Sequence, residues 1–144
     1  MSGRLEYLLD TNVLSETRKK KADRGVMTFL EGTESSTLYI SVLTLGELRK
    51  GVAKKQREDL ETAKRLADWV DGLEYSFADR ILDVDATIAK LWGDWSAERP
   101  RPVVDTLLAA TALERGLTFV TRNIRNVQGL SVKLLDPWLD PWKE

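Results

Sequence analysis

The chain alternates between short apolar runs and longer segments in which apolar residues recur every three or four positions. Short runs rich in β-forming residues indicate buried strands, whereas the longer period indicates helices with one apolar face. The short runs predict strands at 7–9, 37–41, 80–84, 117–121 and 132–136. The longer segments predict helices at 26–32, 42–54, 59–73, 85–98 and 105–116. Because strands alternate with helices, we expect an α/β fold, a three-layer α/β/α sandwich around a mostly parallel central sheet.

Proline and glycine mark two of the boundaries between these elements. Residues 99–102 read Arg-Pro-Arg-Pro, and two prolines in four residues predict a loop. Gly116 ends the apolar period of the last helix, at the position where a glycine commonly stops a helix. The 144 residues show no internal repeat and no Pro-rich or Gly-rich linker, so we expect one domain over residues 1–144.

Composition narrows the possible chemistry. The chain has no cysteine and no histidine, which excludes disulfides, thiolate chemistry, Ser-His-Asp triads and His-ligated zinc. A catalyst of this composition must use carboxylates, hydroxyls, amides, lysine or arginine, and a hard cation that acidifies water is the simplest source of a nucleophile. The absence of cysteine, of a secretory signal pattern and of an apolar stretch near about 18 residues favours a cytoplasmic protein without a membrane span.

The formal net charge of −1 excludes the global basic field that many nucleic-acid-binding domains carry. Basic residues do gather in two runs, Arg-Lys-Lys-Lys at 18–21 and Lys-Lys-Gln-Arg at 54–57. Solvated helix ends or loops are the simpler explanation of such runs. A local patch that contacts phosphates is the alternative.

Polar residues follow the central strands in four distant segments of the chain. Asp10 directly follows the strand at 7–9, and Glu47 lies on the helix after the second strand. Asp105 opens the helix before the strand at 117–121, and Asn123 and Asn126 follow that strand. Ligands of parallel α/β sheets sit beyond the carboxyl ends of the strands. We therefore expect these side chains to approach one edge of the sheet.

Each of these residues also has a structural explanation when it is considered alone. Asp10 and Asp105 suit helix N-caps, Glu47 follows Thr44 at the spacing of a capping box, and the two asparagines suit a polar turn. Capping does not require the acids to converge, however. Converging carboxylates repel one another unless a cation lies between them, so the combination predicts a divalent-metal site.

Four segments of the chain stand out together, namely LLDTNVLSE, SVLTLGELRKGV, DTLLAATALERGLTFVTRN and LLDPW. They resemble the PIN domain, and most of all the VapC and FitB branch of type II toxin–antitoxin ribonucleases, and they follow in that family's order over essentially the whole chain. The resemblance implies a compact α/β/α domain, Mg²⁺ or Mn²⁺ as cofactor and cleavage of RNA. It also implies a homodimer and a small antitoxin whose C-terminal segment lies over the active site.

The resemblance assigns roles to individual residues. Its catalytic, metal-binding acids correspond to Asp10, Glu47 and Asp105. Its supporting polar residues correspond to Thr11, Asn12, Thr121, Asn123 and Asn126. The family often has an aspartate where this chain has the last two asparagines, which predicts a weak second metal site. Basic residues flanking the site are candidate RNA contacts, namely Arg18, Lys19, Lys20, Lys21, Arg49, Lys50, Arg122 and Arg125.

The implied reaction is metal-assisted hydrolysis of a phosphodiester, in which Asp10 and Asp105 hold the cation and Glu47 orients or deprotonates the attacking water. Two alternatives stay open. The asparagines favour a non-catalytic PIN fold that binds RNA or a partner, whereas the three retained acids oppose it. The start Asp10-Thr11-Asn12 imitates that of a haloacid-dehalogenase-like phosphatase, but that chemistry needs a lysine and later acids on a domain that is usually longer.

Overall fold

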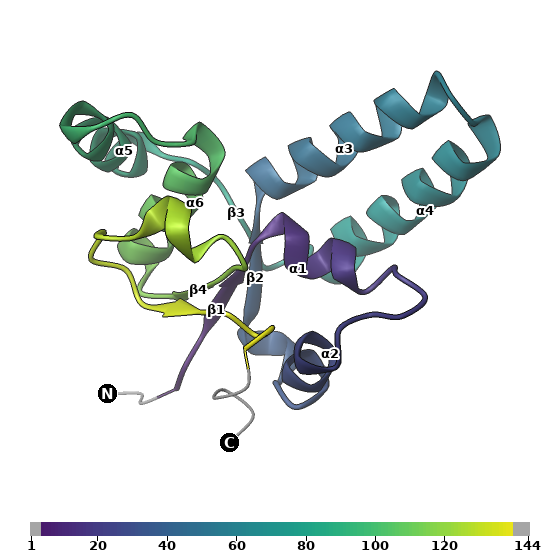
Figure 1. Ribbon diagram of the computed structural model, residues 1–144, viewed down its shortest axis with the longest axis horizontal. Coiled ribbons are helices and arrows are strands. Elements are labelled where there is room, and N and C mark those ends of the chain that lie inside the picture. The colour runs from purple at the N-terminus through teal and green to yellow at the C-terminus, as the bar shows by residue number, and fades with distance from the viewer. Residues whose placement is uncertain (1–3, 140–144) are drawn as a thin grey trace.

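The computed structural model describes residues 4–139, so the ends of the expected domain, 1–3 and 140–144, lie outside the described residues. At its centre is a five-stranded sheet of order β3-β2-β1-β4-β5, in which all four pairs of neighbouring strands are parallel (Figure 1). The strands are β1 Tyr7–Leu9, β2 Leu38–Ser41, β3 Ile81–Leu82, β4 Thr118–Val120 and β5 Leu134–Leu135. The strand order reverses its direction at β1, which makes β1 the topological switch point of the sheet.

Helices cover both faces of the sheet, which confirms the predicted α/β/α architecture. They are α1 Thr11–Glu16, α2 Arg24–Glu31, α3 Val42–Gln56, α4 Leu60–Ser76, α5 Ala86–Glu98 and α6 Val103–Arg115. Two short 3-10 turns, η1 Ser35–Thr37 and η2 Ile124–Val127, complete the described elements. Among residues 4–139, no helix combines the length and the apolar character needed to cross a bilayer.

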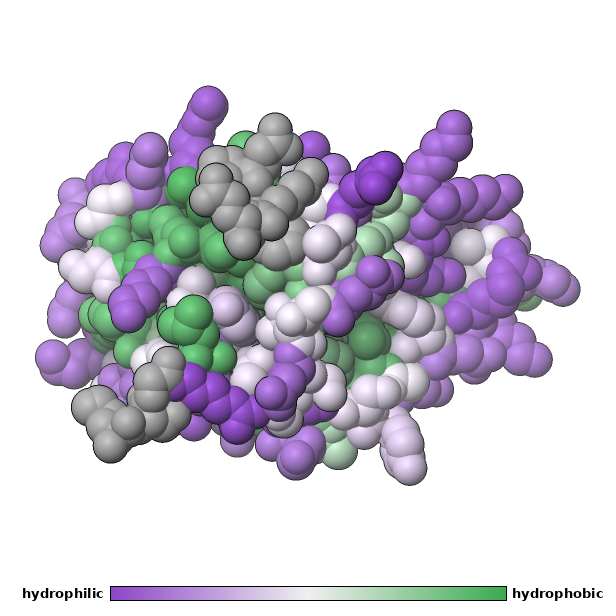
Figure 2. Space-filling model, turned by 90° about the horizontal axis from the view of Figure 1, so that it is seen from below, coloured by the Kyte–Doolittle hydropathy of each residue, from purple (hydrophilic) through white to green (hydrophobic). Residues whose placement is uncertain are grey.

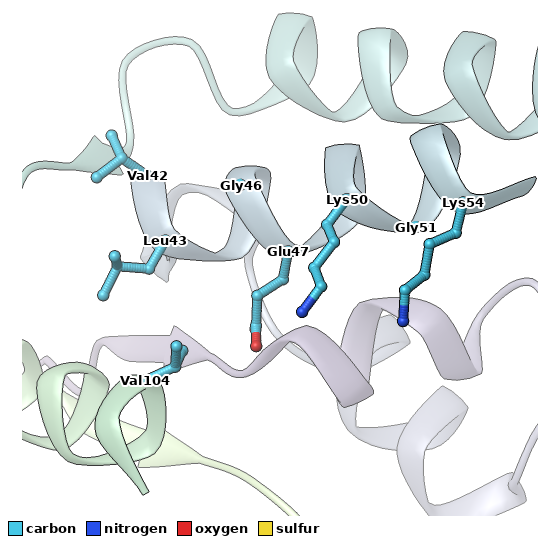
Figure 3. A pocket seen from close by; sticks show the side chains of 8 residues that line it. All are labelled: Val42, Leu43, Gly46, Glu47, Lys50, Gly51, Lys54 and Val104. Carbon is cyan, nitrogen blue, oxygen red and sulfur yellow. The ribbon is translucent and has the colours of Figure 1, made fainter. Parts of the chain in front are cut away.

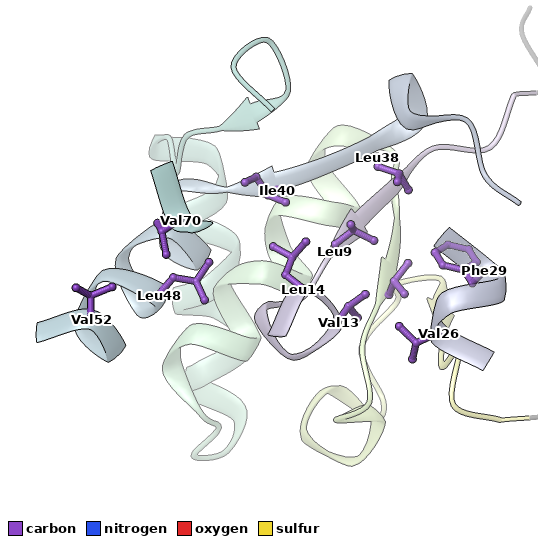
Figure 4. Close-up of a cluster of buried hydrophobic side chains, with 11 residues drawn as sticks. Leu9, Val13, Leu14, Val26, Phe29, Leu38, Ile40, Leu48, Val52 and Val70 are labelled. Carbon is purple, nitrogen blue, oxygen red and sulfur yellow. The ribbon is translucent and has the colours of Figure 1, made fainter. Parts of the chain in front are cut away.

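The two layers of helices bury alternate residues of the same strands. Leu9 and Val120 belong to a core cluster with side chains from α1 to α4, and Figure 4 shows how these helices surround it. Leu8 and Phe119 belong to a second cluster, packed mainly against α6. Successive side chains of a strand point to opposite faces, and here both faces are covered. The strands therefore read as unbroken apolar runs, which is why they were visible in the sequence.

The predicted elements occur in the predicted order, with differences at their ends. The six-residue helix α1 was not predicted separately, because it is too short to show an apolar period. Helix α4 runs through Gly72 to Ser76, three residues beyond the predicted end. The predictions at 80–84 and 132–136 were too long, because β3 and β5 are edge strands that pair over only two residues each.

Helices α3 and α4 form a hairpin that projects from the sheet in Figure 1. Seen from below (Figure 2), its projecting end at the right is covered by hydrophilic residues, while hydrophobic residues gather on the other half of the molecule. The apolar faces of the two helices are mostly buried, with Leu48, Val52 and Val70 in the core. Leu60 and Tyr75, near the two ends of α4, are its large apolar side chains left exposed.

Helix α6 ends as predicted at Gly116, whose φ of +70° lies in the left-handed region. The Leu117 N–H donates to the Ala112 carbonyl at 2.8 Å and the Gly116 N–H donates to the Leu113 carbonyl at 3.2 Å. These two bonds form a Schellman motif, which satisfies carbonyls at the helix end. A side chain at this position would strain the backbone, because left-handed φ values are costly for L-residues.

We predict that Gly116→Ala lowers the free energy of unfolding by about 1–2 kcal/mol, measured by urea denaturation. Gly72→Ala is the matched control, because Gly72 lies inside α4 and a Cβ there would meet nothing within 4 Å. That control should raise stability by about 0.5–1 kcal/mol, since alanine favours a helix. Equal effects of the two substitutions would contradict the role given to the left-handed backbone.

Candidate active site

Four of the five polar side chains predicted to converge, all but Asn126, line a pocket beyond the carboxyl end of β1. The pocket has a volume of about 350 Å³. Its lining residues are Asp10, Thr11, Asn12, Ser15, Glu47, Asp105 and Asn123. Three of the four expected segments thus contribute the three acids, and the fourth contributes Asn123. The site sits at the switch point of the sheet, where α/β proteins commonly hold ligands.

Asp10 is the buried residue at the base of the pocket, with only 3% of its surface exposed. Its backbone N–H donates to the Val120 carbonyl at 2.9 Å, so the residue is still tied to the sheet. The Thr11 N–H donates to Oδ1 at 2.7 Å and the Thr121 hydroxyl donates to Oδ2 at 2.6 Å. Asp10 is therefore both the N-cap of α1 and a pocket residue, so the two explanations of its position hold together.

Burial is the main reason why the pKa of Asp10 is raised, from an ordinary value of 3.8 to about 6. The hydrogen bond from Thr121 and the one from the Thr11 backbone lower this pKa. The negative charges of Asp105 and Glu47 raise it further. A cation near these acids would reverse the unfavourable charge balance and favour the ionised form of Asp10.

Glu47 points from α3 toward α1 and accepts a hydrogen bond from the Thr11 hydroxyl, with 2.5 Å between Oγ1 and Oε1. The capping-box alternative for Glu47 is wrong, because the N-cap of α3 is Ser41, whose hydroxyl accepts from the Leu43 N–H. Thr44 lies inside the helix, fully buried, with its Oγ1 3.2 Å from that of Thr11. The exposed carboxylate of Glu47 is therefore held by a side chain of the pocket and not by the end of its own helix.

Asp105 does not cap α6, contrary to its structural alternative. The helix begins at Val103, directly after Pro102, and Asp105 is its third residue. The Asn126 side-chain amide donates to Asp105 Oδ2 at 2.7 Å. Asn126 therefore positions Asp105, and it is absent from the lining of the pocket.

Three supporting residues complete the surroundings of the acids. Thr121 is buried, and besides donating to Asp10 it accepts a hydrogen bond from the Asn123 N–H at 3.0 Å. The Asn12 Oδ1 atom is buried and has no hydrogen-bond partner within the described part of the chain. Ser15 is a pocket residue that the sequence analysis missed. Its position one helical turn after Thr11 is the signal that could have identified it.

The donor atoms of this pocket fit a hard divalent cation. The residues that line the pocket carry carboxylate and amide oxygens, which are the ligands that Mg²⁺ and Mn²⁺ prefer. The buried Asn12 Oδ1 has no partner in the described part of the chain and is a further oxygen of this kind. No group of three acidic side chains within residues 4–139 is close enough to hold one ion directly. Water molecules would complete the coordination shell, as is usual for Mg²⁺.

The basic residues that were candidate RNA contacts differ in their surroundings, since some contact other side chains and others are only exposed. Arg49 is directed toward α4, where it forms ion pairs with Asp71 and Glu74. Arg18 lies over the Trp69 ring and Arg122 over the Trp138 ring, at 5.2 and 5.0 Å, and Lys19 pairs with Glu16 at 3.0 Å. The remaining candidates, Lys20, Lys21, Lys50 and Arg125, are exposed. Among these candidates, Lys50 lines a groove together with Glu47, which is one of the acids of the site.

The fold and the pocket define an α/β protein with an acidic, oxygen-lined site at the switch point of a parallel sheet. The model of the PIN domain family matches residues 7–128, and the chain belongs to this family.

Comparison with individual proteins points in the same direction. Toxin FitB from Neisseria gonorrhoeae is 31% identical over 142 residues, covering 92% of this chain and 99% of FitB. VapC ribonuclease Y4jK from Sinorhizobium fredii is 29% identical over 140 residues, covering 91% of this chain and 96% of the relative. A crystal structure of FitAcB from Neisseria gonorrhoeae has a TM-score of 0.82 at 28% identity, covering 92% of this chain and 98% of that chain.

The raised pKa of Asp10 predicts how stability depends on pH in the absence of metal. Below about pH 4 the carboxyl group is protonated in the folded and the unfolded chain alike. As the pH rises through about 6, the folded chain must release a proton that it binds more tightly than the unfolded chain, so the stabilising contribution of protonated Asp10 is lost.

We therefore predict that Asp10→Asn raises the free energy of unfolding by about 1–2 kcal/mol near pH 8, and by much less near pH 4. Urea denaturation in the presence of a chelator measures both values. An advantage of the variant that is the same at both pH values would show that the charge of Asp10 is not its cause.

Proposed function

We propose that this protein is a metal-dependent endoribonuclease and the toxin of a type II toxin–antitoxin pair. The observation that carries the proposal is that Asp10, Glu47 and Asp105 line one pocket and are close enough for their negative charges to interact. Membership of the PIN domain family supports it, as do relatives named ribonuclease and toxin. Because histidine and cysteine are absent, a carboxylate-bound cation is the simplest source of the nucleophile.

The three acids would divide two tasks in this reaction. Asp10 and Asp105 would hold Mg²⁺ or Mn²⁺, and the bound ion would polarise a phosphoryl oxygen and lower the pKa of a water molecule. Glu47 is the exposed carboxylate of the three, and the Thr11 hydroxyl fixes one of its oxygens. Its other oxygen has no hydrogen-bond partner within residues 4–139 and would orient the attacking water and accept its proton.

Asn126 bears on the non-catalytic alternative, which the two asparagines favoured. Because its amide donates to Asp105, an amide at this position has a positioning role that an aspartate could not fill. Its presence is therefore compatible with an active site. We further propose a small antitoxin partner, a homodimer and a cytoplasmic location, on the basis of the family and of relatives that include toxin FitB.

We predict that Asp10→Asn and Asp105→Asn each reduce RNA cleavage in Mg²⁺ by at least about 100-fold, because each removes a charged ligand. Asp68→Asn on α4 is the control, since this acid is exposed and lies outside the pocket. Cleavage of a labelled RNA, together with growth arrest on expression, measures the effect. Full cleavage by Asp10→Asn would overturn the proposed function.

The two asparagines should respond differently to conversion into aspartate. Asn123 lines the pocket, so Asn123→Asp adds a charged ligand and should tighten Mg²⁺ binding by roughly tenfold. Asn126→Asp replaces the donor to Asp105 by a like charge, so it should weaken binding or destabilise the fold. Calorimetric titration of the RNA-free proteins distinguishes the two. Two equally tight ions in the wild-type protein would contradict the expected weak second site.

A further inference from the structure

A groove of about 550 Å³ extends from the acid pocket along α3 (Figure 3). Glu47 lines both the pocket and the groove, so the two surfaces are continuous. On one side of Glu47 the groove is lined by Lys50 and Lys54, and on the other side by Val42, Leu43 and Val104. One end of the groove is therefore basic and the other is aliphatic, with a candidate catalytic acid between them.

The two lysines follow Glu47 on the same face of α3. The spacing from Glu47 to Lys50 and Lys54 is three and seven residues, which brings side chains to one side of a helix. Figure 3 shows all three side chains extending from α3 in the same direction, into the groove. Lys50 and Lys54 are separated by about 6 Å along the helix axis, so they present two successive charges in line with the acid.

Neither lysine is neutralised by an acid of the described chain. Within residues 4–139, the side chains of Lys50 and Lys54 make no ion pair, whereas their neighbour Lys55 pairs with Glu58 at 3.5 Å. Arg49 on the same helix pairs with acids of α4. A favourable interaction with the carbonyl end of α3 would account for Lys54, which lies in the last turn, but not for Lys50.

The aliphatic end of the groove complements the lysines. Val42 is 37% exposed, so part of its apolar side chain is accessible at this end of the groove. Nucleic acid bases have apolar faces that pack against such side chains, and these faces are accessible in single strands but not within a duplex. Phosphates, in contrast, are neutralised by lysine.

We propose that a single strand of RNA lies along α3, with two phosphates on one side of the cleaved bond bound by Lys50 and Lys54. A base on the other side of that bond packs against Val42, Leu43 and Val104. This inference rests on the proposed function, and it names the path of the substrate through the site. Lys50 and Lys54 are positioning residues, since they hold the strand and do not touch the reacting atoms.

The test measures how RNA affinity depends on salt. A labelled single-stranded RNA of mixed sequence is titrated with protein by fluorescence anisotropy in a chelator, so that no cleavage occurs. For the double variant Lys50→Gln, Lys54→Gln, the slope of log K against log salt should become shallower by about 1.4, or about 0.7 for each lost phosphate contact. Each single variant, Lys50→Gln or Lys54→Gln, should show half of this change. Lys55→Gln is their matched control, because it also removes one positive charge from α3, and its slope should equal that of the wild type.

The aliphatic wall should respond in another way. Val42→Ser should weaken RNA binding by a similar factor at every salt concentration, with an unchanged slope, because no phosphate contact is lost. Inorganic polyphosphate, which has no bases, should lose affinity for the lysine double variant and bind Val42→Ser as it binds the wild type.

The outcomes separate this inference from the proposed function. A wild-type slope in the lysine double variant, with RNA cleavage by the wild type intact, would overturn the RNA path alone and leave the groove to a protein partner. A shallower slope in that variant, with no cleavage by the wild type in Mg²⁺ or Mn²⁺, would sustain the path and overturn the nuclease. A wild-type protein that binds no RNA would overturn both.

Discussion

The cost of burying the carboxylate of Asp10 is the constraint on which the site depends. A buried carboxylate without compensation is expensive, and here the charges of Asp105 and Glu47 add to that cost. The hydrogen bonds from Thr11 and Thr121 offset only part of it, since the pKa still rises to about 6. The fold thus holds a group whose ionised form a nearby positive charge would stabilise. This favours the proposed cation site for a physical reason that does not depend on any particular relative.

Each acid of the pocket is held by a neutral donor from another element. Asp10 is held by Thr121 after β4, Glu47 by Thr11 of α1, and Asp105 by Asn126 of η2. Neutral donors position a carboxylate without cancelling its charge, whereas an arginine or lysine would compete with a cation. Basic side chains contact none of these three carboxylates in the described part of the chain. The site is therefore preorganised and remains negative.

The convergence of the three acids could be predicted because it depends on topology, since the ends of buried parallel strands share one edge. The partners of the acids could not, because they depend on local geometry that leaves no pattern. Asn126 reaches Asp105 only because η2 follows β4, and α6 begins at Val103 after a proline whose φ of −58° suits entry into a helix. The direction of Arg49 was equally hidden, since its partners Asp71 and Glu74 lie on the other helix of the hairpin. Basic residues in a sequence do not reveal whether acids already neutralise them.

The position of β1 in the sheet has a consequence for how the chain is made. β1 lies between β2 and β4, and Thr121 bonds to Asp10 across 111 residues of sequence. Native pairing over such a separation forms slowly and needs nearly the whole chain. During synthesis, the first aspartate leaves the ribosome long before the strand that completes its surroundings. A chain that stops directly before β4 therefore has all three acids of the site without the strand that supports them.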